Sequence, residues 1–552
     1  MNFINKEIRY RQLLSIMLFA FIQMLSLISP YLMGTIIDDY IPNRKITRIT
    51  LGILLFVMIP FITVLLQTVY NYYLIKYVRK KGNEFALKIM EKLVYKEKSY
   101  FDKENSLELL SYSSKEAIGY INFYTVDLSK YYVNIIIAVI TFFILCMISP
   151  MLGMIQIVYL PFAYFPVRKI TKNVNEEVQM VLKQNAEINQ VKGDVFKAIE
   201  FIKLFRLEQK KLQEVDKKNQ FINGIWGKIA ALDTLSGIWT SGFSTVLFTG
   251  ITFGVGTLLI LLGENPLQVG QLISIITYCS LFYSNINSVF HTVIDKKKKE
   301  SEYSKMFSYL ELIGEREKDE KKGEFILNDK IEFKGCKFGY NEEELILNGL
   351  NICFDKGSWT GIIGTSGGGK STIFDIIMKL YEVKDGEVFI DGKDINQINC
   401  FSIRENVTKI TQEIFLFPGT LEYNLRLACP TATEEEIQQA LTFACLEEYI
   451  ALLPNGIKTD VGEAGKLMSG GERQRLSIAM GILRKNKIML LDEVTSSLDP
   501  KIEAKLTENF YSLIKQGYTI ISISHRMDFL KYADTIYEIE NGKAVKKIKK
   551  NS

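Results

Sequence analysis

Two glycine-rich segments in the C-terminal half of the chain have residue types suited to binding phosphate. The first runs from Gly364 to Thr372 and reads Gly-Thr-Ser-Gly-Gly-Gly-Lys-Ser-Thr. In such a loop, backbone N–H groups turn inward around phosphate oxygens, Lys370 carries charge to the β- and γ-phosphates, and the Ser371 hydroxyl faces Mg²⁺. The second, from Met468 to Glu472, is another glycine-flanked helix start that can hold an anion.

The residues on either side of the first segment supply the elements that a phosphate-binding loop requires. Residues 358–363 form a short apolar stretch typical of a strand, and residues 372–378 open a helix with an apolar face. The order strand, glycine loop, helix distinguishes this motif from a chance match. A second anion-binding helix start in the same domain indicates that each nucleotide is shared between two subunits.

The N-terminal half of the chain is strongly apolar. With 552 residues the chain is too long for one ordinary domain, and two or three are expected. A bilayer-spanning helix needs about 20 mostly apolar residues. Runs of that kind lie near 13–37, 51–75, 131–149, 151–167, 233–262 and 267–291.

Charge predicts how these spans are oriented. Lysine and arginine clusters follow the second, fourth and sixth runs, so these ends and both termini are expected in the cytoplasm. The segments between the spans at 76–130 and 168–232 are long, charged and helix-forming, and we expect them to project from the membrane as levers. A net charge of +5 is mild and gives no reason to expect nucleic acid as a partner.

From residue 330 onward the motifs follow the order of an ABC transporter nucleotide-binding domain. Together with the six preceding spans, the whole chain resembles an exporter-type half-transporter. The resemblance implies a multi-domain chain in which an all-α six-span transmembrane domain precedes an α/β P-loop ABC ATPase domain. The expected boundaries are 1–300 for the membrane domain, 301–328 for a linker and 329–552 for the ATPase domain.

The resemblance also implies which residues bind ATP. In this family an aromatic residue ahead of the loop stacks on adenine, and Tyr340 matches it. The signature residues from Ser469 onward are expected to complete the site of a second chain. The ATP-binding residues that the resemblance implies are Tyr340, Gly364, Thr365, Ser366, Gly367, Gly368, Gly369, Lys370, Ser371, Thr372, Gln412, Ser469, Gly470, Gly471, Glu472 and Asp499.

An apolar stretch at 488–491 ends on two carboxylates, Asp492 and Glu493. Unpaired charge at the end of a buried strand is energetically costly, so two carboxylates at this position indicate a functional role. By the resemblance, Glu493 orients the attacking water as general base. The implied catalytic residues are Glu493, His525, Gln412 and Lys370. The residues expected around Mg²⁺ are Ser371, Gln412 and Asp492.

Two features depart from the family's usual pattern. The signature has Met468 where leucine is usual and Glu472 where glutamine is usual. Methionine keeps the apolar volume and glutamate is a frequent alternative, so activity is expected to survive.

The elements that couple the membrane domain to the ATPase domain are expected near 105–109 and 198–205.

The resemblance implies an ATP hydrolase that drives transport, with ATP and Mg²⁺ as cofactors, in a cell membrane and as a dimer with alternating access. A homodimer is favoured because the catalytic residues are intact, and a heterodimer is the alternative. The central parts of the spans lack ionisable residues but contain amides and aromatics, which suits an amphiphilic peptide, lipid or drug.

Three amide residues are candidates for a substrate cavity, and interhelical contacts are the alternative role for each. They are Gln67, Asn71 and Asn287. Export is the expected direction, but no residue encodes it. An importer built on the exporter fold and a non-transporting ATP-gated regulator or channel are the alternative functions.

Overall fold

The computed structural model divides the chain into two compact units. Unit 1 comprises Met1–Val94 and Glu104–Leu312, and unit 2 comprises Tyr95–Lys103 and Ile313–Ser552. The structure describes residues 6–103, 109–110, 112–171, 174–262, 267–311, 314–341, 344–412 and 415–549.

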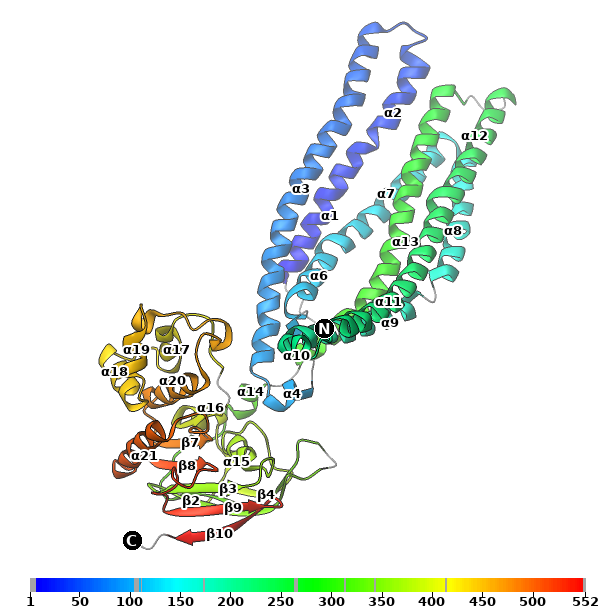
Figure 1. The fold of residues 1–552 in the computed structure, drawn as a ribbon. Coiled ribbons are helices and arrows are strands. Elements are labelled where there is room, and N and C mark those ends of the chain that lie inside the picture. The colour runs from blue at the N-terminus through cyan, green and yellow to red at the C-terminus, as the bar shows by residue number, and fades with distance from the viewer. Residues whose placement is uncertain are drawn as a thin grey trace. The chain divides into compact units, whose positions relative to one another are not determined.

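The described elements of unit 1 are all helical (Figure 1). Six helical stretches are long and apolar enough to cross a membrane, which confirms the expected number of spans. They are Glu7–Tyr40, Ile46–Val94, Ser114–Ile148, Pro150–Lys169, Glu208–Leu262 and Val269–Val293. The helices are α1 (Lys6–Ser26), α2 (Ile28–Thr35), α3 (Ile46–Val94), α6 (Ala117–Asn122), α7 (Leu128–Ile148), α8 (Pro150–Thr171), α9 (Val174–Lys197), α10 (Ile199–Leu204), α11 (Glu208–Gly237), α12 (Thr245–Leu262) and α13 (Val269–Glu311).

Helices form here because a bilayer offers no water to hydrogen-bond the backbone. Short π-helical stretches, such as Ile36–Tyr40 after α2 and Phe123–Asp127 before α7, keep the chain helical between the regular segments. The core of the bundle is an apolar cluster that includes the fully buried Leu145, Ile275 and Tyr283.

The C-terminal end of α2 and the N-terminal end of α13 approach each other closely. A Cβ atom on Gly34 would lie 2.2 Å from Ser274 Oγ, and one on Gly270 would lie 2.6 Å from the carbonyl oxygen of Gly34. Small residues allow membrane helices to approach in this way. Asp38 accepts hydrogen bonds of 2.7 Å from the backbone N–H groups of Gly270 and Gln271, at the N-terminus of α13.

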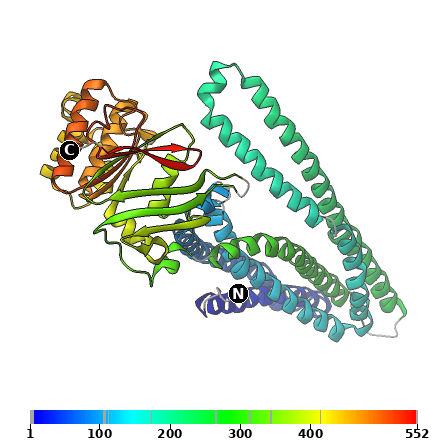
Figure 2. The ribbon, with the colours of Figure 1, turned by 90° about the horizontal axis from the view of Figure 1, so that it is seen from below.

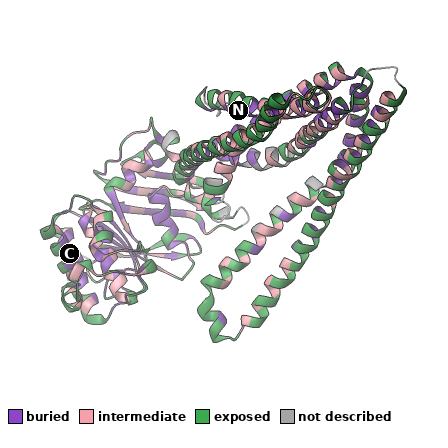
Figure 3. Cartoon of the chain, turned by 90° about the horizontal axis from the view of Figure 1, so that it is seen from above, coloured by how far each residue is buried: buried purple, intermediate pink, exposed green. Residues whose placement is uncertain are grey.

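The expected inner segment at 168–232 is a helical hairpin in which α10 joins α9 to α11 (Figure 2). Its two arms meet along a narrow stripe that includes Val181, Ile188 and Ile225, and much of the remaining surface is exposed (Figure 3). At α10, the side chains of Phe201 and Leu204 are exposed. The expected coupling element at 198–205 therefore coincides with this short helix, and its coupling role stays a prediction.

Unit 2 contains two β-sheets with helices around them. A four-stranded antiparallel sheet has the order β2-β1-β4-β5, and a six-stranded sheet has the order β10-β9-β3-β8-β7-β6. In the larger sheet β6, β7, β8, β3 and β9 are parallel, and β10 is antiparallel to β9. The strands are β1 (Lys330–Phe338), β2 (Leu347–Asp355), β3 (Trp359–Gly364), β4 (Asp385–Ile390), β5 (Lys393–Asp394), β6 (Val407–Ile410), β7 (Ile488–Asp492), β8 (Thr519–Ile523), β9 (Thr535–Glu540) and β10 (Lys543–Lys549).

Strands β7 and β8 are buried along their whole length, as expected for parallel strands covered on both faces. One apolar cluster lies between the two sheets, and a second lies under the helices that follow β6. The helices of unit 2 are α4 (Lys98–Lys103), α14 (Glu315–Asp319), α15 (Lys370–Ile377), α16 (Cys400–Asn406), α17 (Leu421–Ala428), α18 (Glu434–Phe443), α19 (Glu447–Leu452), α20 (Gly470–Leu483) and α21 (Pro500–Lys515).

The short segment Tyr95–Lys103 packs within unit 2, although it follows directly on α3. Tyr95 accepts a 2.8 Å hydrogen bond from the Glu315 N–H and stacks edge-on against Phe401, while Asp102 accepts a hydrogen bond from Tyr381. The coupling element expected at 105–109 lies mostly outside the described residues. The coupling role of 105–109 stays a prediction.

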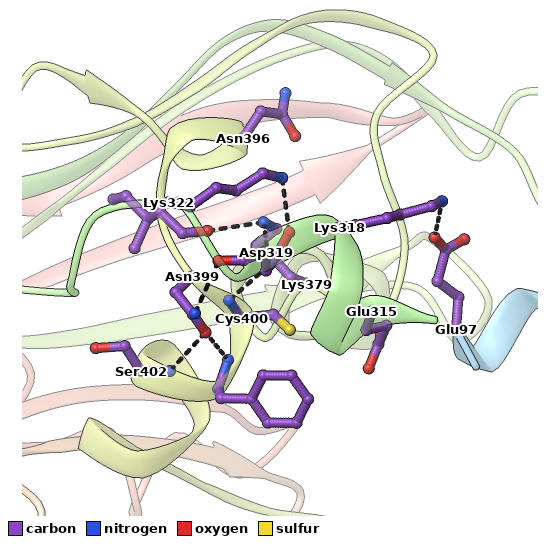
Figure 4. Close-up of polar contacts among 12 residues, drawn as sticks. Glu97, Glu315, Lys318, Asp319, Lys322, Lys379, Asn396, Asn399, Cys400 and Ser402 are labelled. Carbon is purple, nitrogen blue, oxygen red and sulfur yellow. Dashed lines mark hydrogen bonds and ion pairs between the residues drawn. The ribbon is translucent and has the colours of Figure 1, made fainter. Parts of the chain in front are cut away.

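A buried carboxylate, Asp319, fixes α14 to the rest of unit 2 (Figure 4). It contacts Lys322 at 2.7 Å and Lys379 at 3.0 Å, and it accepts a hydrogen bond from the Cys400 N–H at 2.8 Å. Burial raises the pKa of this carboxyl, but the three hydrogen bonds more than offset that effect and hold the pKa at about 2. Nearby, Glu315 forms a bidentate pair with Arg404 at 2.7 and 2.9 Å.

Candidate nucleotide site

Four of the expected site segments follow the carboxyl ends of neighbouring parallel strands. The glycine loop begins at the end of β3, His525 follows β8, Glu493 follows β7 and Gln412 follows β6. The strand order β3-β8-β7-β6 makes these ends adjacent. In open α/β sheets this edge is where ligands bind.

The glycine loop has a backbone that only glycine adopts easily. Gly364, Gly367 and Gly369 have φ values of 145°, 78° and 88°. A Cβ on Gly364 would lie 2.4 Å from the Ile539 carbonyl oxygen, so a side chain there would collide with β9. Thr365, Ser366 and Gly368 complete the turn, which ends at the N-terminus of α15.

Lys370 spans the loop from the first turn of α15. Its ammonium donates hydrogen bonds to the carbonyl oxygens of Gly364 at 2.9 Å and Thr365 at 2.8 Å. Burial lowers the pKa of Lys370, and the negative charges of Glu493 and Asp492 partly offset this. A phosphate group would supply the negative charge that this buried cation lacks.

The pair Ser371 and Asp492 fits Mg²⁺ chemically. Ser371 Oγ donates to Asp492 Oδ1 at 3.1 Å, and both atoms are the hard oxygen ligands that Mg²⁺ takes. Burial raises the pKa of Asp492, although the Ser371 hydrogen bond and Lys409 oppose this. Among the described residues, no group of three or more His, Cys, Asp or Glu side chains could hold a metal.

Glu493 and His525 lie next to each other at the ends of β7 and β8. His525 Nε2 is 3.3 Å from Glu493 Oε1, and both side chains are partly exposed. Glu493 has a φ of 50°, a left-handed backbone that is uncommon for a side chain of this size. Strained backbone of this kind concentrates at functional sites.

Tyr340 and Thr372 are brought together ahead of the loop. The Tyr340 hydroxyl lies 3.2 Å from Thr372 Oγ1, and its ring stands edge-on to Phe338 and Tyr381 at 5.1 Å. The Tyr340 side chain is 46% exposed, which leaves an aromatic face for a base to stack on. Gln412 is exposed two residues after β6.

The signature segment forms a capped helix start. The Ser469 side chain accepts a hydrogen bond from the Glu472 N–H at 3.3 Å, and Glu472 accepts one from the Ser469 N–H at 2.7 Å. This capping box gives Glu472 a structural role that explains why glutamate is tolerated there. Met468 is buried, as its expected role as an apolar filler requires. Gly470 and Gly471 form the first turn of α20.

Gln474 is a positioning residue that the sequence reasoning missed. This buried side chain donates to the carbonyl oxygen of Glu493 at 2.8 Å and accepts from the Ser497 N–H at 3.1 Å. It therefore connects the signature helix to the proposed base and to the loop after it. Asp499, by contrast, caps its own helix α21 through the N–H groups of Lys501 and Ile502.

Arg526, next to His525, was also missed. It donates to Glu503 Oε2 at 2.6 Å and to the carbonyl oxygens of Ser496 and Leu498. Glu503 is buried and accepts a second hydrogen bond from Thr495. No motif identifies the arginine directly after His525, because its role depends on partners 23 to 30 positions away in the sequence.

The three candidate cavity residues do not share one environment. Asn287 is buried and its Oδ1 accepts a 2.9 Å hydrogen bond from the Tyr159 hydroxyl, which joins α13 to α8. This contact is the interhelical role that the sequence left open. Gln67 and Asn71 are half-buried on α3.

Comparisons with known proteins agree with this architecture. The family profile described as "ABC transporter transmembrane region" matches residues 13–286, and that described as "ABC transporter" matches residues 347–496. A relative named "Uncharacterized ABC transporter ATP-binding protein y4gM", from Sinorhizobium fredii, is 30% identical over 71% of this chain and 67% of its own length. An "ATP-dependent lipid A-core flippase" from Syntrophus aciditrophicus is 27% identical over 71% of this chain and 65% of its own.

A solved structure shares the fold over nearly the whole chain. It is titled "Structure of a bacterial Atm1-family ABC exporter with ATP bound", and it aligns with a TM-score of 0.88 over 98% of this chain and 95% of that chain at 21% identity. The chain belongs to the ABC transporter family. It is a multi-pass membrane protein of the exporter-type half-transporter architecture, with an ATP-binding domain fused after six spans.

Proposed function

We propose that the chain is one half of a dimeric, Mg²⁺-dependent ATPase that exports an amphiphilic compound by alternating access across a cell membrane. The observation that carries this proposal is the convergence of a phosphate loop, a carboxylate pair and a histidine at adjacent parallel strand ends, in a chain with six membrane spans. Both termini and the ATP-binding unit would then be cytoplasmic.

In this proposal each side chain of the site has its own role in phosphoryl transfer. Lys370 would bind the β- and γ-phosphates, Glu493 would orient and deprotonate the attacking water, and His525 would hydrogen-bond the γ-phosphate. Gln412, beyond β6, would contact the cation and the water. When bound beside Ser371 and Asp492, Mg²⁺ would neutralise phosphate charge.

The signature helix supports a shared site. Its exposed N-terminus at Ser469 offers backbone N–H groups and the positive end of the helix dipole, which suits a phosphate bound by another chain. In the described chain it packs against Ser497, after the carboxylate pair. In a dimer closed by two ATP molecules, each ATP would lie between the phosphate loop of one chain and the signature helix of the other. A homodimer is the simplest such assembly.

The substrate class rests on the membrane spans. They offer aromatic and amide side chains without ionisable residues in their central parts, which suits an amphiphilic peptide, lipid or drug. The flippase named among the relatives acts on a lipid, by its name. Import on the same fold and a non-transporting, ATP-gated role remain the alternative proposals.

Reconstitution tests the direction of transport. When MgATP is added outside proteoliposomes, it reaches only those chains whose ATP-binding units face outward. An exporter in that orientation should move fluorescent lipid, peptide or drug probes into the lumen. Glu493→Gln proteoliposomes serve as the matched control and should show no ATP-dependent movement. Probe release from pre-loaded vesicles would support an importer, and ion conductance without probe movement would support a channel.

A further inference from the structure

Unit 1 contains a cavity of about 390 Å³ between α1 and α3. Its walls are one face of each helix, because lining residues such as Arg11, Leu14 and Leu18 recur at helical spacing on α1, and Leu66, Tyr70 and Tyr77 do so on α3. The candidate substrate residues Gln67 and Asn71 do not line it. The lining therefore does not include the residues proposed for the transport path.

The walls of the cavity are apolar along most of its length. Leu18 and Val69 are each 47% exposed, which is far more than a packed core allows. Three hydroxyls of the lining already have hydrogen-bond partners: those of Ser15 and Tyr70 bond to each other at 2.5 Å, and that of Thr125 donates to the Ile121 carbonyl oxygen at 2.6 Å. They do not need a ligand, so the long wall offers a surface for a hydrocarbon chain.

One end of the cavity is cationic. Arg11 is the charged residue in its lining, and the guanidinium carbon lies 5.5 Å from the ring centroid of Tyr77. Among the described residues Arg11 forms no ion pair. Nearby, the carboxylates of Glu7 and Glu84 are both engaged by Lys81, at 3.1 and 2.9 Å.

A second polar group at this end lacks a partner. The hydroxyl oxygen of Tyr77 is buried and makes no hydrogen bond to the described residues. A buried hydroxyl without a partner costs free energy, and a nearby acceptor would recover it after a small side-chain shift. Arg11 and Tyr77 together thus suit an anionic group rich in acceptor oxygens, such as a phosphodiester.

The length of the cavity matches one leaflet. From Arg11 to Ile22 the rise along α1 is about 16 Å, roughly half of a hydrocarbon core about 30 Å thick. Arg11 lies in the basic N-terminal stretch that the proposed orientation places at the cytoplasmic surface. We propose that this cavity binds an anionic glycerophospholipid of the cytoplasmic leaflet, with the phosphate at Arg11 and Tyr77 and one acyl chain between α1 and α3.

Native mass spectrometry of the purified full chain tests this site with palmitoyl-oleoyl phosphatidylglycerol against the zwitterionic phosphatidylcholine of the same chains. The wild type should retain phosphatidylglycerol about fivefold better, the effect of one basic residue near an anionic surface. Arg11→Gln should abolish this preference and Arg11→Lys should restore it. Leu18→Trp, which fills the cavity, should lower retention of both lipids.

Two variants outside the cavity are matched controls. Arg79→Gln removes a charge from the same end of α3, and Leu13→Trp enlarges an exposed residue on another face of α1; both should behave as the wild type. Equal retention of the two lipids, or an equal loss of preference in Arg79→Gln, would overturn the proposal. Because the measurement needs neither turnover nor orientation, ATP hydrolysis measured in parallel separates failure of this site from failure of the proposed function.

Discussion

Single residues at the strand ends determine what the site can do. The glycine loop, the carboxylate pair and the histidine were predictable because each is a short contiguous motif beside an apolar strand. Gln474 and Arg526 were not, because a buried amide and a surface-type cation gain their roles only from partners brought in by the fold. Their contacts hold the backbone around Glu493, the residue with the left-handed φ.

Glu493→Gln should reduce steady-state ATP hydrolysis by at least a hundredfold, because the carboxylate is the proposed base while the phosphate contacts lie elsewhere. ATP binding, measured with a fluorescent analogue, should remain. Glu508→Gln, an exposed residue on α21, is the matched control. More than a tenth of wild-type turnover in Glu493→Gln would show that another group is the base.

Gln474→Leu should lower the free energy of unfolding by about 1–3 kcal/mol, since the backbone groups of Glu493 and Ser497 lose buried partners. The same change at the exposed Gln439 of α18 should have little effect. Thermal unfolding of both variants in detergent measures the difference. Equal behaviour of the two would mean that the Gln474 contacts contribute no net stability.

At the scale of elements, periodicity predicted the membrane helices and the helical extension at 168–232 well, since apolar length and amphipathic spacing are local properties. The sequence could not show that α13 continues to Glu311, into the region expected as a linker. Nor could it show that α14 is fixed by Asp319, because that carboxylate looks like any other charge in a lysine-rich stretch.

Asp319→Asn should destabilise the protein by about 3 kcal/mol at neutral pH, because Lys379 would be left buried without its counter-charge. The pKa of Asp319 is depressed to about 2 in the folded chain. Its stabilising effect should thus be fully present above about pH 4 and be lost as the pH falls toward 2.

Thermal unfolding of the full chain, compared with the exposed control Asp528→Asn, checks both the size and the pH range of this effect. An Asp319→Asn difference that stayed constant down to pH 2 would contradict the ion-pair explanation.

The polar residues of the spans should separate into two groups. Asn287→Ala should lose up to about 1–2 kcal/mol of stability, because the Tyr159 hydroxyl loses its acceptor. Gln67→Ala and Asn71→Ala should leave stability unchanged and alter the stimulation of ATP hydrolysis by transported compounds. A panel of lipids, peptides and drugs, run beside thermal unfolding, distinguishes them. Stability losses in all three variants, with an unchanged stimulation profile, would contradict the substrate-binding role proposed for these residues.

At the scale of the whole molecule, the proposed dimer assigns the two phosphate-binding helix starts of one unit to two different ATP sites. With the native cysteines removed, Ser366→Cys combined with Ser469→Cys should cross-link between chains when ATP is present, since both positions are exposed. Denaturing gels would show a dimer band. Ser366→Cys alone is the control. Cross-linking confined to single chains would contradict the shared site.

The contact of Tyr95 with Phe401 also has a consequence for biosynthesis. The ribosome makes Tyr95 about 300 residues before Phe401, which at about 5–20 residues per second is a delay of about 15 to 60 s. During that time the segment Tyr95–Lys103 has emerged without the surface on which it packs. The C-terminal unit therefore includes a segment that is made well before the rest of it, and this contact can form only after Phe401 has been synthesised.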